Sequence, residues 1–350
     1  MSIKRILFLS VFALILILMP GCRKMTETVK DTKTSDASET SRIVFAMDTV
    51  MDIKMYGENS KAAVDECEKE IYRLEKLFSA TDPEGDVSKI NDSAGEWSMV
   101  SPDTLELMKL SLEFSAMTSG NFDITTYRIL KSWGFTTGEY RLPSKEEMDS
   151  LVPLIDYNCV DIDNDSVRIK EGQQIDFGGI AKGYLADRLV ETASENGVES
   201  AVISLGGNVA VIGKNKEGNL WRVGIQDPVD TADYLGVVSM TDTSVVTSGS
   251  YMRYFEKDGM VYHHIIDPFT GYPAKSGLLS MTIICKSSTK ADALSTALFV
   301  MGKDKALEYW EKTKDFDFVA VTDDMTVYVT EGIAGSFAFK DNGRYELVLL

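Results

Sequence analysis

The sequence is poor in cysteine and histidine, and both shortages restrict the kind of protein it can be. It has 4 cysteines and 2 histidines among 350 residues. No CxxC pair and no Cys/His spacing typical of a zinc site occurs, and cysteines this few and this widely spaced make no disulfide framework. Apart from Cys22, the cysteines stand in mostly apolar or strand-like surroundings that favour buried thiols: Cys67, Cys159 and Cys285.

Positive charge is also scarce. Asp and Glu number 54 against 36 Lys and Arg, which gives a formal net charge of −18. Such a chain would repel phosphate backbones, so the composition argues against nucleic acid and against an extended grip on anionic lipid. An anionic cofactor would need local help from backbone N–H groups, a lysine or a metal. With 44% hydrophobic residues, the chain can bury a sizeable core and is expected to be globular.

The apolar run at the N-terminus, residues 6–19, is too short for a comfortable membrane span. Two basic residues precede it, and the pattern predicts a signal peptide over residues 1–21. Cys22 follows Gly21 directly, which resembles the bacterial lipoprotein processing site, where lipid is attached to the cysteine. An ordinary secretory signal with an incidental cysteine is the alternative. Lipid on Cys22 would anchor the protein to a bacterial membrane in an extracytoplasmic location.

Residues 22–42 hold almost no large apolar side chains, so burial cannot offset the conformational entropy that they would lose on ordering. They are predicted to be a flexible tether. No repeat or second linker is visible, and residues 43–350 are expected to form a single compact domain. Apolar spacing and capping residues predict helices near 60–78, 102–114, 180–196 and 289–301. Strand-like runs occur at 201–205, 209–212, 221–225, 237–240, 280–284 and 318–321. Since these elements interleave irregularly, the predicted fold class is α+β.

Residues 176–183 (DFGGIAKG) follow a strand-like approach and precede a predicted helix. Glycines at such a joint let the backbone approach a ligand closely, and a helix N-terminus offers unpaired N–H groups to an anion. Lys182 adds a positive charge suited to a phosphate or to a flavin carbonyl. A simple tight turn before the helix is the alternative interpretation of these glycines.

The two histidines, His263 and His264, are adjacent and lie just before a turn sequence, DPFTG, at 267–271. On a strand they would point to opposite faces, so at most one enters a given pocket. That histidine would suit a general base, because imidazole titrates near neutrality. Both could equally be ordinary surface or half-buried histidines.

Two further segments carry residues suited to a ligand. Asp292 and Thr296 are four apart on one predicted helix, and a carboxylate with a hydroxyl is a hard-oxygen pair that suits Mg²⁺. The alternative is an acid favoured by the helix dipole beside a packed threonine. In the segment 120–125, Phe122 could stack on a planar ring and Asp123 could accept from ring or ribose donors. Phe122 could equally belong to the core.

Taken together and in order, these segments resemble the FAD:protein FMN transferases, the ApbE family of bacterial flavinyltransferases. The matching blocks are AMDT at 46–49, FS at 78–79, SKIN at 88–91, GNFD at 120–123, DFGGIAKGYLAD at 176–187, SLGGNV at 204–209, TSGSY at 247–251, HIIDPFTGYP at 264–273 and ADALSTALFVMG at 291–302. Any one block is unspecific, whereas six or more in the same order are highly specific. The resemblance covers nearly the whole chain after the tether and implies a single flavinyltransferase-like domain of the α+β class.

The resemblance also implies roles for particular residues. It implies an FAD site formed by Met47, Thr81, Asn121, Phe122, Asp123, Asp176, Lys182 and the backbone around Ile266. It implies a magnesium ion ligated by Asp292, Thr296 and the carbonyl of Gly179, with His264 as the catalytic base and Asp292 as a second catalytic residue. Two positions depart from the family. Thr81 stands where many members carry a tyrosine that stacks on the flavin, and Asp48 stands where glycine is usual.

The implied reaction is the Mg²⁺-dependent transfer of FMN from FAD to a Thr or Ser hydroxyl of an acceptor redox protein, with release of AMP. The acceptor would be an exported or membrane-bound protein. Because Thr81 cannot stack on a flavin, water could enter the site, and an FAD pyrophosphatase that yields FMN and AMP is an alternative. A non-enzymatic flavin-binding lipoprotein is a further alternative, which the Asp292/Thr296 pair disfavours.

Overall fold

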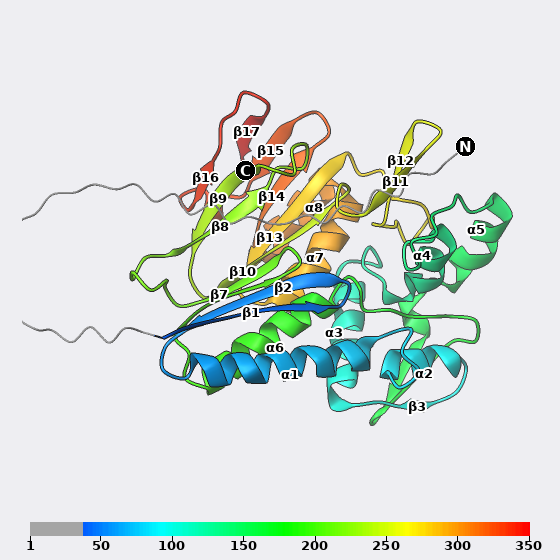
Figure 1. Cartoon of the computed structure of the whole chain (residues 1–350). Helices are drawn as coiled ribbons and strands as arrows, with labels where there is room; N and C mark the ends of the chain where they lie inside the picture. The colour runs from blue at the N-terminus through cyan, green and yellow to red at the C-terminus, as the bar shows by residue number, and fades with distance from the viewer. Residues whose placement is uncertain (1–37) are drawn as a thin grey trace, which may run out of the picture. The chain divides into compact units, whose positions relative to one another are not determined.

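The computed structural model describes residues 38–350 (Figure 1). The predicted signal peptide, Cys22 and most of the predicted tether lie outside these residues, so the predictions made for them stay predictions. The first strand, β1 (Glu39–Ala46), begins ahead of the predicted domain start at residue 43. It pairs along its whole length with β2 (Thr49–Tyr56), from Glu39 opposite Tyr56 to Ala46 opposite Thr49. Residues 39–42 therefore belong to the folded domain, and the tether boundary predicted at residue 42 is too late.

A nine-stranded sheet forms the centre of the domain, in the order β1-β2-β6-β7-β10-β13-β14-β15-β17. Its further strands are β6 (Ser200–Leu205), β7 (Asn208–Ile212), β10 (Thr243–Gly249), β13 (Leu278–Cys285), β14 (Asp317–Thr322), β15 (Thr326–Val329) and β17 (Glu346–Leu349). Every neighbouring pair is antiparallel except β15 with β17. A mixed, mostly antiparallel sheet of this kind confirms the predicted α+β class.

Smaller sheets complete the strands. One has three strands, β8 (Trp221–Gln226), β9 (Tyr234–Met240) and β16 (Phe337–Phe339), and another joins β3 (Ser98–Met99), β4 (Val160–Asp163) and β5 (Ser166–Ile169). A two-stranded hairpin consists of β11 (Tyr254–Lys257) and β12 (Met260–His263). The predicted strands in β6 to β9, β13 and β14 are all confirmed.

The helices are α1 (Ser60–Phe78), α2 (Asp86–Asp92), α3 (Pro102–Met117), α4 (Tyr127–Trp133), α5 (Lys145–Leu151), α6 (Ala181–Glu195), α7 (Ser288–Met301) and α8 (Lys303–Thr313). Short 3-10 helices span Ile124–Thr126, Val152–Leu154, Tyr157–Cys159 and Glu331–Ile333. The predicted helices are confirmed, and their ends use the predicted residues. The Ser101 side chain accepts from the Thr104 amide, and Gly302 ends α7. No helix in residues 38–350 is long and apolar enough to cross a bilayer.

Three helices pack on the strands of the large sheet, as Figure 1 shows: α1 on β1 and β2, α6 on β6 and β7, and α7 on β10 and β13. The helical face of α1 predicted from its apolar spacing is buried there, including Cys67. Cys285 is buried as well, whereas Cys159 is only half-buried, which corrects that part of the prediction. All three are free thiols.

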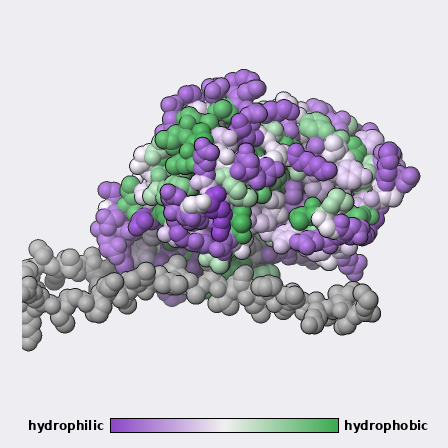
Figure 2. Space-filling view, turned by 90° about the horizontal axis from the view of Figure 1, so that it is seen from above, coloured by the Kyte–Doolittle hydropathy of each residue, from purple (hydrophilic) through white to green (hydrophobic). Residues whose placement is uncertain are grey.

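The three-stranded sheet β8-β9-β16 packs against the middle strands of the large sheet through a common apolar cluster. It leaves the outer surface of β1 and β2 uncovered, where Ile43, Phe45 and Val50 are exposed. Elsewhere hydrophobic residues reach the surface in small groups among hydrophilic ones, as on the face in Figure 2. The core therefore lies on both sides of the strands from β7 to β15 but on only one side of β1 and β2.

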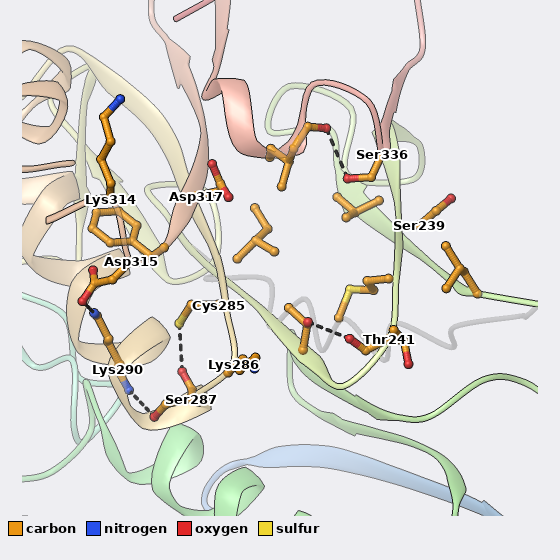
Figure 3. Close-up of a pocket in the computed structure, with 17 residues that line it drawn as sticks. Ser239, Thr241, Cys285, Lys286, Ser287, Lys290, Lys314, Asp315, Asp317 and Ser336 are labelled. Carbon is orange, nitrogen blue, oxygen red and sulfur yellow. Dashed lines mark hydrogen bonds and ion pairs between the residues drawn. The ribbon is translucent and has the colours of Figure 1, made fainter. Parts of the chain in front are cut away.

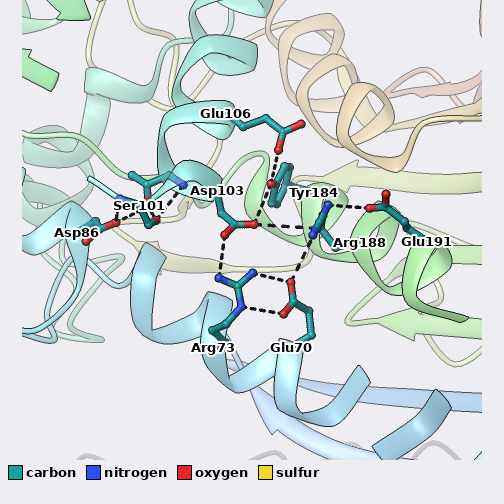
Figure 4. A network of polar contacts seen from close by, with 10 residues as sticks. Glu70, Arg73, Asp86, Ser101, Asp103, Glu106, Tyr184, Arg188 and Glu191 are labelled. Carbon is teal, nitrogen blue, oxygen red and sulfur yellow. Dashed lines mark hydrogen bonds and ion pairs between the residues drawn. The ribbon is translucent and has the colours of Figure 1, made fainter. Parts of the chain in front are cut away.

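A polar network fixes α6 to its neighbouring helices (Figure 4). The Tyr184 hydroxyl donates to Glu106 of α3 at 2.8 Å. Arg73 of α1 donates to Glu70 at 2.7 Å and to Asp103 of α3 at 2.8 Å, and the Arg73 hydrogen bond lowers the pKa of Asp103. Because α6 begins at the glycine segment singled out in the sequence, this network holds that segment in place relative to α1 and α3.

Candidate active site

Three turns from distant parts of the sequence meet at one end of the large sheet. The turn at 206–207 contacts the turn that joins β1 to β2, since a Cβ on Gly206 would lie only 2.1 Å from the Thr49 hydroxyl oxygen. A Cβ on Gly207 would lie 3.9 Å from the terminal methyl of Met252, just beyond β10. Both glycines have positive φ, at 61° and 105°, a conformation that favours glycine. The AMDT, SLGGNV and TSGSY blocks therefore converge.

The predicted magnesium ligands also come together. The Gly183 amide, in the first turn of α6, donates to Asp292 Oδ2 of α7 at 2.8 Å. Thr296 Oγ1 would lie 3.7 Å from a Cβ on Gly179. Ser248 of β10 lies 3.3 Å from Thr296 Oγ1. The carboxylate and the hydroxyl thus lie beside the glycine turn, which is more than a hundred residues away from them in sequence.

The residues present fit a magnesium ion. Residues 38–350 contain no group of three or more His, Cys, Asp or Glu side chains able to hold a metal, and the predicted set has only one such side chain. Its other donors are the Thr296 hydroxyl and the Gly179 carbonyl. Asp292 is buried, and within the described residues its Oδ1 receives no hydrogen bond. Hard oxygens in small number suit Mg²⁺, which keeps several waters and relies on substrate phosphate.

The GNFD block lies beside the glycine turn, and its side chains make contacts within the fold. Phe122 is buried, with a ring carbon 3.2 Å from the position of a Cβ on Gly179. Asp123 accepts from the Thr125 amide at 2.8 Å and from the Tyr157 amide at 3.1 Å, and burial raises its pKa. Asn121 donates to a backbone carbonyl at 2.8 Å. Each carboxylate oxygen of Asp123 therefore accepts from a backbone amide, and Phe122 packs in the core. The roles predicted for both residues in FAD binding stay predictions.

The two histidines meet different partners, and β12 ends at His263, so His264 lies just beyond the strand on which opposite faces were predicted. His263 has its Nε2 3.1 Å from the Ala274 carbonyl oxygen and packs edge-on against Phe299. His264 has both its amide nitrogen and its Nδ1 close to the Arg253 carbonyl oxygen, at 3.0 and 3.1 Å. Because a carbonyl oxygen only accepts, Nδ1 must carry the ring proton, and Nε2 keeps its lone pair. His264 is thus held in the tautomer that a base requires.

Charged groups gather around His264 and the start of α6. Burial and the nearby Arg253 cation lower the pKa of His264 to about 3. Burial raises the pKa of Asp176 to about 6, against the opposing effect of the Gly178 amide, which donates to it at 2.6 Å, and of the Arg253 and Lys182 cations. Arg253 was not among the predicted residues. It reaches the site only because β11 pairs with β12 and brings residue 253 beside residue 264, a pairing that no local pattern indicates.

The DPFTG turn seats the His264 segment against the GNFD block. Ile266 bridges to Pro273, and the Gly271 carbonyl accepts from the Trp133 indole at 2.8 Å. A Cβ on Gly120 would lie 3.6 Å from the Phe269 ring. Trp133 belongs to an aromatic cluster that fixes the β11–β12 hairpin, together with Phe135, Tyr140, Phe255, Tyr262 and Tyr272. The segment that carries His264 is therefore held in place by the DPFTG turn and this aromatic cluster.

Met47 bonds to α1, and Thr81 bonds within the loop that follows α1. Met47 and Asp48 both have positive φ, at 47° and 58°, and the Met47 amide donates to Glu75 at 2.7 Å. Aspartate tolerates this conformation better than most residues, which accounts for Asp48 where the family usually has glycine. Thr81 is exposed, and its hydrogen bonds within the described residues are local, to Ser79.

Two cavities in the described residues lie apart from the predicted ligands. One of about 670 Å³ lies at the opposite end of β10 and β13, where Thr243, Cys285 and Lys290 line it (Figure 3). A second, of about 590 Å³, lies between α5 and the DPFTG turn, next to Phe269. The first cavity includes none of the predicted site residues. Burial raises the pKa of its Cys285 thiol to about 12, so this thiol is unreactive near neutral pH.

The lowered pKa of His264 predicts a pH effect on stability. In the unfolded chain, His264 has an ordinary pKa of 6.5 and binds a proton below that pH. In the folded protein, its imidazole stays unprotonated down to about pH 3. Acidification through that window therefore favours the unfolded state. Asp176 acts in the opposite direction, because its raised pKa lets the folded state bind the extra proton. We expect the melting temperature of the wild type to fall more between pH 7 and pH 4.5 than that of His264→Gln. Parallel curves would contradict this electrostatic account.

Comparisons with known proteins agree with the arrangement of the blocks. The model of the ApbE family matches residues 47–320. The FAD:protein FMN transferase of Treponema pallidum is 32% identical over 318 residues, which cover 84% of this chain and 88% of the relative. That of Klebsiella pneumoniae is 31% identical over 283 residues, with coverage of 79% and 87%. The crystal structure of the ApbE protein of Thermotoga maritima has a TM-score of 0.76 at 36% identity and covers 87% of this chain and 98% of its own. The apo flavinyl transferase ApbE of Pseudomonas stutzeri has a TM-score of 0.75 at 29% identity, covering 83% and 93%.

Proposed function

The chain belongs to the ApbE family, and on that premise we propose that it is a Mg²⁺-dependent transferase that moves FMN from FAD to a Thr or Ser hydroxyl of an acceptor protein, with release of AMP. The relatives from Treponema pallidum and Klebsiella pneumoniae are both FAD:protein FMN transferases. The observation that carries the proposal is the contact between Asp292 and the first turn of α6. It places an acid and a hydroxyl beside a helix N-terminus, where the diphosphate of FAD would bind.

The start of α6 is suited to an anion in spite of the overall charge of −18. Within the described residues, the amides of Gly179 and Lys182 donate no hydrogen bond. The Lys182 amine lies near this turn, with its Nζ 3.4 Å from the Gly178 carbonyl. Two free N–H groups and one ammonium therefore offer the positive field that a diphosphate needs. When bound to Asp292, Thr296 and the Gly179 carbonyl, Mg²⁺ would neutralise charge on the phosphates.

His264 would serve as the base. Its Nε2 would take the proton of the acceptor hydroxyl as the hydroxyl oxygen attacks the phosphorus on the FMN side of the diphosphate. A phosphoester bond to the acceptor forms, the bond to AMP breaks, and AMP leaves. Phosphoryl transfer of this kind depends mainly on positioning and charge neutralisation. The Arg253 carbonyl orients the His264 ring, and the DPFTG turn holds its segment in place. Both contacts help to position the base.

The test is an acceptor-dependent assay. The protein is incubated with FAD, Mg²⁺ and a candidate acceptor, and AMP release and acceptor mass are measured together. We expect one AMP for each FMN attached, no attachment to an acceptor whose hydroxyl residue is replaced by Ala or Val, and no reaction with EDTA. AMP and free FMN in equal amounts without acceptor would instead indicate the second candidate, an FAD pyrophosphatase. Intact FAD after prolonged incubation with Mg²⁺ would contradict both.

The second candidate is favoured by one feature, the exposed Thr81 where many family members stack a tyrosine on the flavin. Thr81→Tyr should tighten FAD binding about 3- to 10-fold, the value of one aromatic contact, and should suppress hydrolysis. FAD affinity and acceptor-free FMN release are the measurements. Thr81→Val is the matched control, because it alters the side chain without adding a ring and should leave both unchanged. If Thr81→Tyr behaves like Thr81→Val, the missing ring has no bearing on hydrolysis.

We further propose that the acceptor is an exported or membrane-bound protein and that Cys22 carries the lipid that anchors this chain on the same side of the membrane. Support comes from the charged and apolar segments before Cys22 in the sequence. Mass spectrometry of the mature N-terminus decides the matter. A mature chain that begins before or after residue 22, or that begins there without lipid, would rule the anchor out.

A further inference from the structure

Helices α6 and α7 approach each other closely at Gly183. A Cβ there would lie 2.3 Å from the Ser288 carbonyl oxygen and 2.7 Å from the Asp292 Cβ. Only glycine allows this approach. The first turn of each helix carries N–H groups that have no partner within their own helix. At this distance, each helix can supply acceptors to the other.

The Asp292 side chain supplies an acceptor to α6. Ile180 precedes α6 and has no side-chain oxygen, so the helix lacks a cap of its own. Asp292 Oδ2 takes that place by accepting from the Gly183 amide at 2.8 Å. One oxygen of the proposed metal ligand is therefore engaged by the neighbouring helix, and the other, Oδ1, is left for a cation.

Asp187 supplies acceptors to α7 in return. Its Oδ1 accepts from the Ser288 amide at 2.7 Å, and its Oδ2 accepts from the Thr289 amide at 3.0 Å and the Thr289 hydroxyl at 2.7 Å. The Ser287 hydroxyl also donates to Oδ2, at 2.9 Å, and accepts from the Lys290 amide at 3.2 Å. Asp187 thus accepts hydrogen bonds from both backbone and side-chain donors at the start of α7.

The two caps are reciprocal. Gly183 and Asp187 are four apart on α6, and Ser288 and Asp292 are four apart on α7, so each pair lies on one helix face. Gly183 bonds to Asp292, and Asp187 bonds to Ser288. A shift of one helix along the other would break both caps. The position of Asp292 relative to the Gly179 turn is therefore tied to Asp187.

We propose that Asp187 is a positioning residue for magnesium, which acts by fixing the first turn of α7 and with it the direction of Asp292 Oδ1. This inference rests on the proposed magnesium site. Residues that orient metal ligands typically change metal affinity about 10- to 100-fold when they are replaced. Asp187 contacts the ligand-bearing helix without itself belonging to the proposed ligands.

The experiment measures Mg²⁺ binding by calorimetry in the presence of FAD, using the full chain. Asp187→Ala is expected to weaken Mg²⁺ binding about 10- to 100-fold, while FAD affinity measured without metal stays unchanged. Transfer should recover most of the wild-type rate at saturating Mg²⁺. Glu191→Ala is the matched control. It removes an exposed carboxylate one turn further along the same helix, which pairs with Arg188, and should leave Mg²⁺ affinity unchanged.

Unchanged Mg²⁺ affinity in Asp187→Ala would overturn the proposal, even if its transfer rate or melting temperature fell. If that variant does not fold, Thr289→Val tests the same cap by removing one donor to Asp187. It should weaken Mg²⁺ binding in the same direction, and wild-type affinity would overturn the proposal. Weakened Mg²⁺ binding without any flavin on an acceptor would uphold the role of Asp187 and overturn only the transfer function.

Discussion

Replacing Asp292 by alanine is expected to lower FMN transfer by at least about 10³-fold, since a metal ion supplies several kcal/mol of charge stabilisation to a reacting phosphate. Asp292 contributes the only carboxylate of the proposed ligand set and is buried against the first turn of α6. A neutral side chain there would leave the Thr296 hydroxyl and the Gly179 carbonyl, which are too weak to hold Mg²⁺ by themselves. AMP release and the mass of the acceptor measure the loss.

The same carboxylate also caps α6, so a folding effect must be separated from loss of metal. Asp292→Asn keeps a side-chain oxygen for the Gly183 amide but removes the negative charge. It should retain the fold and most FAD binding while transfer remains lost. Asp304→Asn is the control for charge alone, because Asp304 is exposed at the start of α8. Transfer by Asp292→Asn at the wild-type rate and the wild-type Mg²⁺ requirement would remove Asp292 as a metal ligand.

Replacing His264 by glutamine is expected to slow transfer about 10²- to 10⁴-fold, the usual contribution of a positioned general base. FAD binding should change little, since the imidazole acts on the acceptor hydroxyl. Burial and Arg253 keep the pKa of His264 near 3, so its Nε2 is unprotonated at every ordinary assay pH. The wild-type rate should therefore show no loss on acidification near pH 6.5, the point at which an ordinary histidine gains its proton.

His263 provides the matched control at the adjacent position. Its ring packs on Phe299 and meets the Ala274 carbonyl, away from Arg253. His263→Gln should lower the melting temperature and leave the transfer rate of the folded enzyme close to that of the wild type. If both variants lose transfer equally, or if His264→Gln transfers at the wild-type rate, His264 is not the base.

Several features of the site could be predicted from residue types and spacing. The apolar pattern and the terminal glycine of α7 predicted this helix from the sequence. Asp292 and Thr296, four residues apart, could therefore be placed on one helix face. Strand alternation was expected to separate His263 from His264, but β12 ends at His263, and the Arg253 carbonyl orients the His264 ring. The residues of the FAD and magnesium sites, however, were assigned from the resemblance to a family, not from spacing alone. Their roles as ligands stay predictions until the variants above are measured.

Other features could not be predicted because they depend on contacts between distant segments. Arg253 enters the site through strand pairing across the β11–β12 hairpin. The contacts of Asp123 with the Thr125 and Tyr157 amides and the core position of Phe122 had no local signal, and their predicted part in FAD binding stays a prediction. Only a three-dimensional arrangement distinguishes a carboxylate that bonds its own backbone from one that faces a ligand.

What the sequence alone determined was part of the set of elements: helices α1, α3, α6 and α7, the central strands β6, β7, β13 and β14, and the α+β class. These follow from short-range periodicity and from capping residues such as Ser101 and Gly302, which act within one or two turns. The tertiary structure decided the earlier start of the domain at β1, the reciprocal caps between α6 and α7 and the position of Arg253. Each of these depends on backbone groups that find partners far away in the chain, and a sequence read locally contains no signal for such partners.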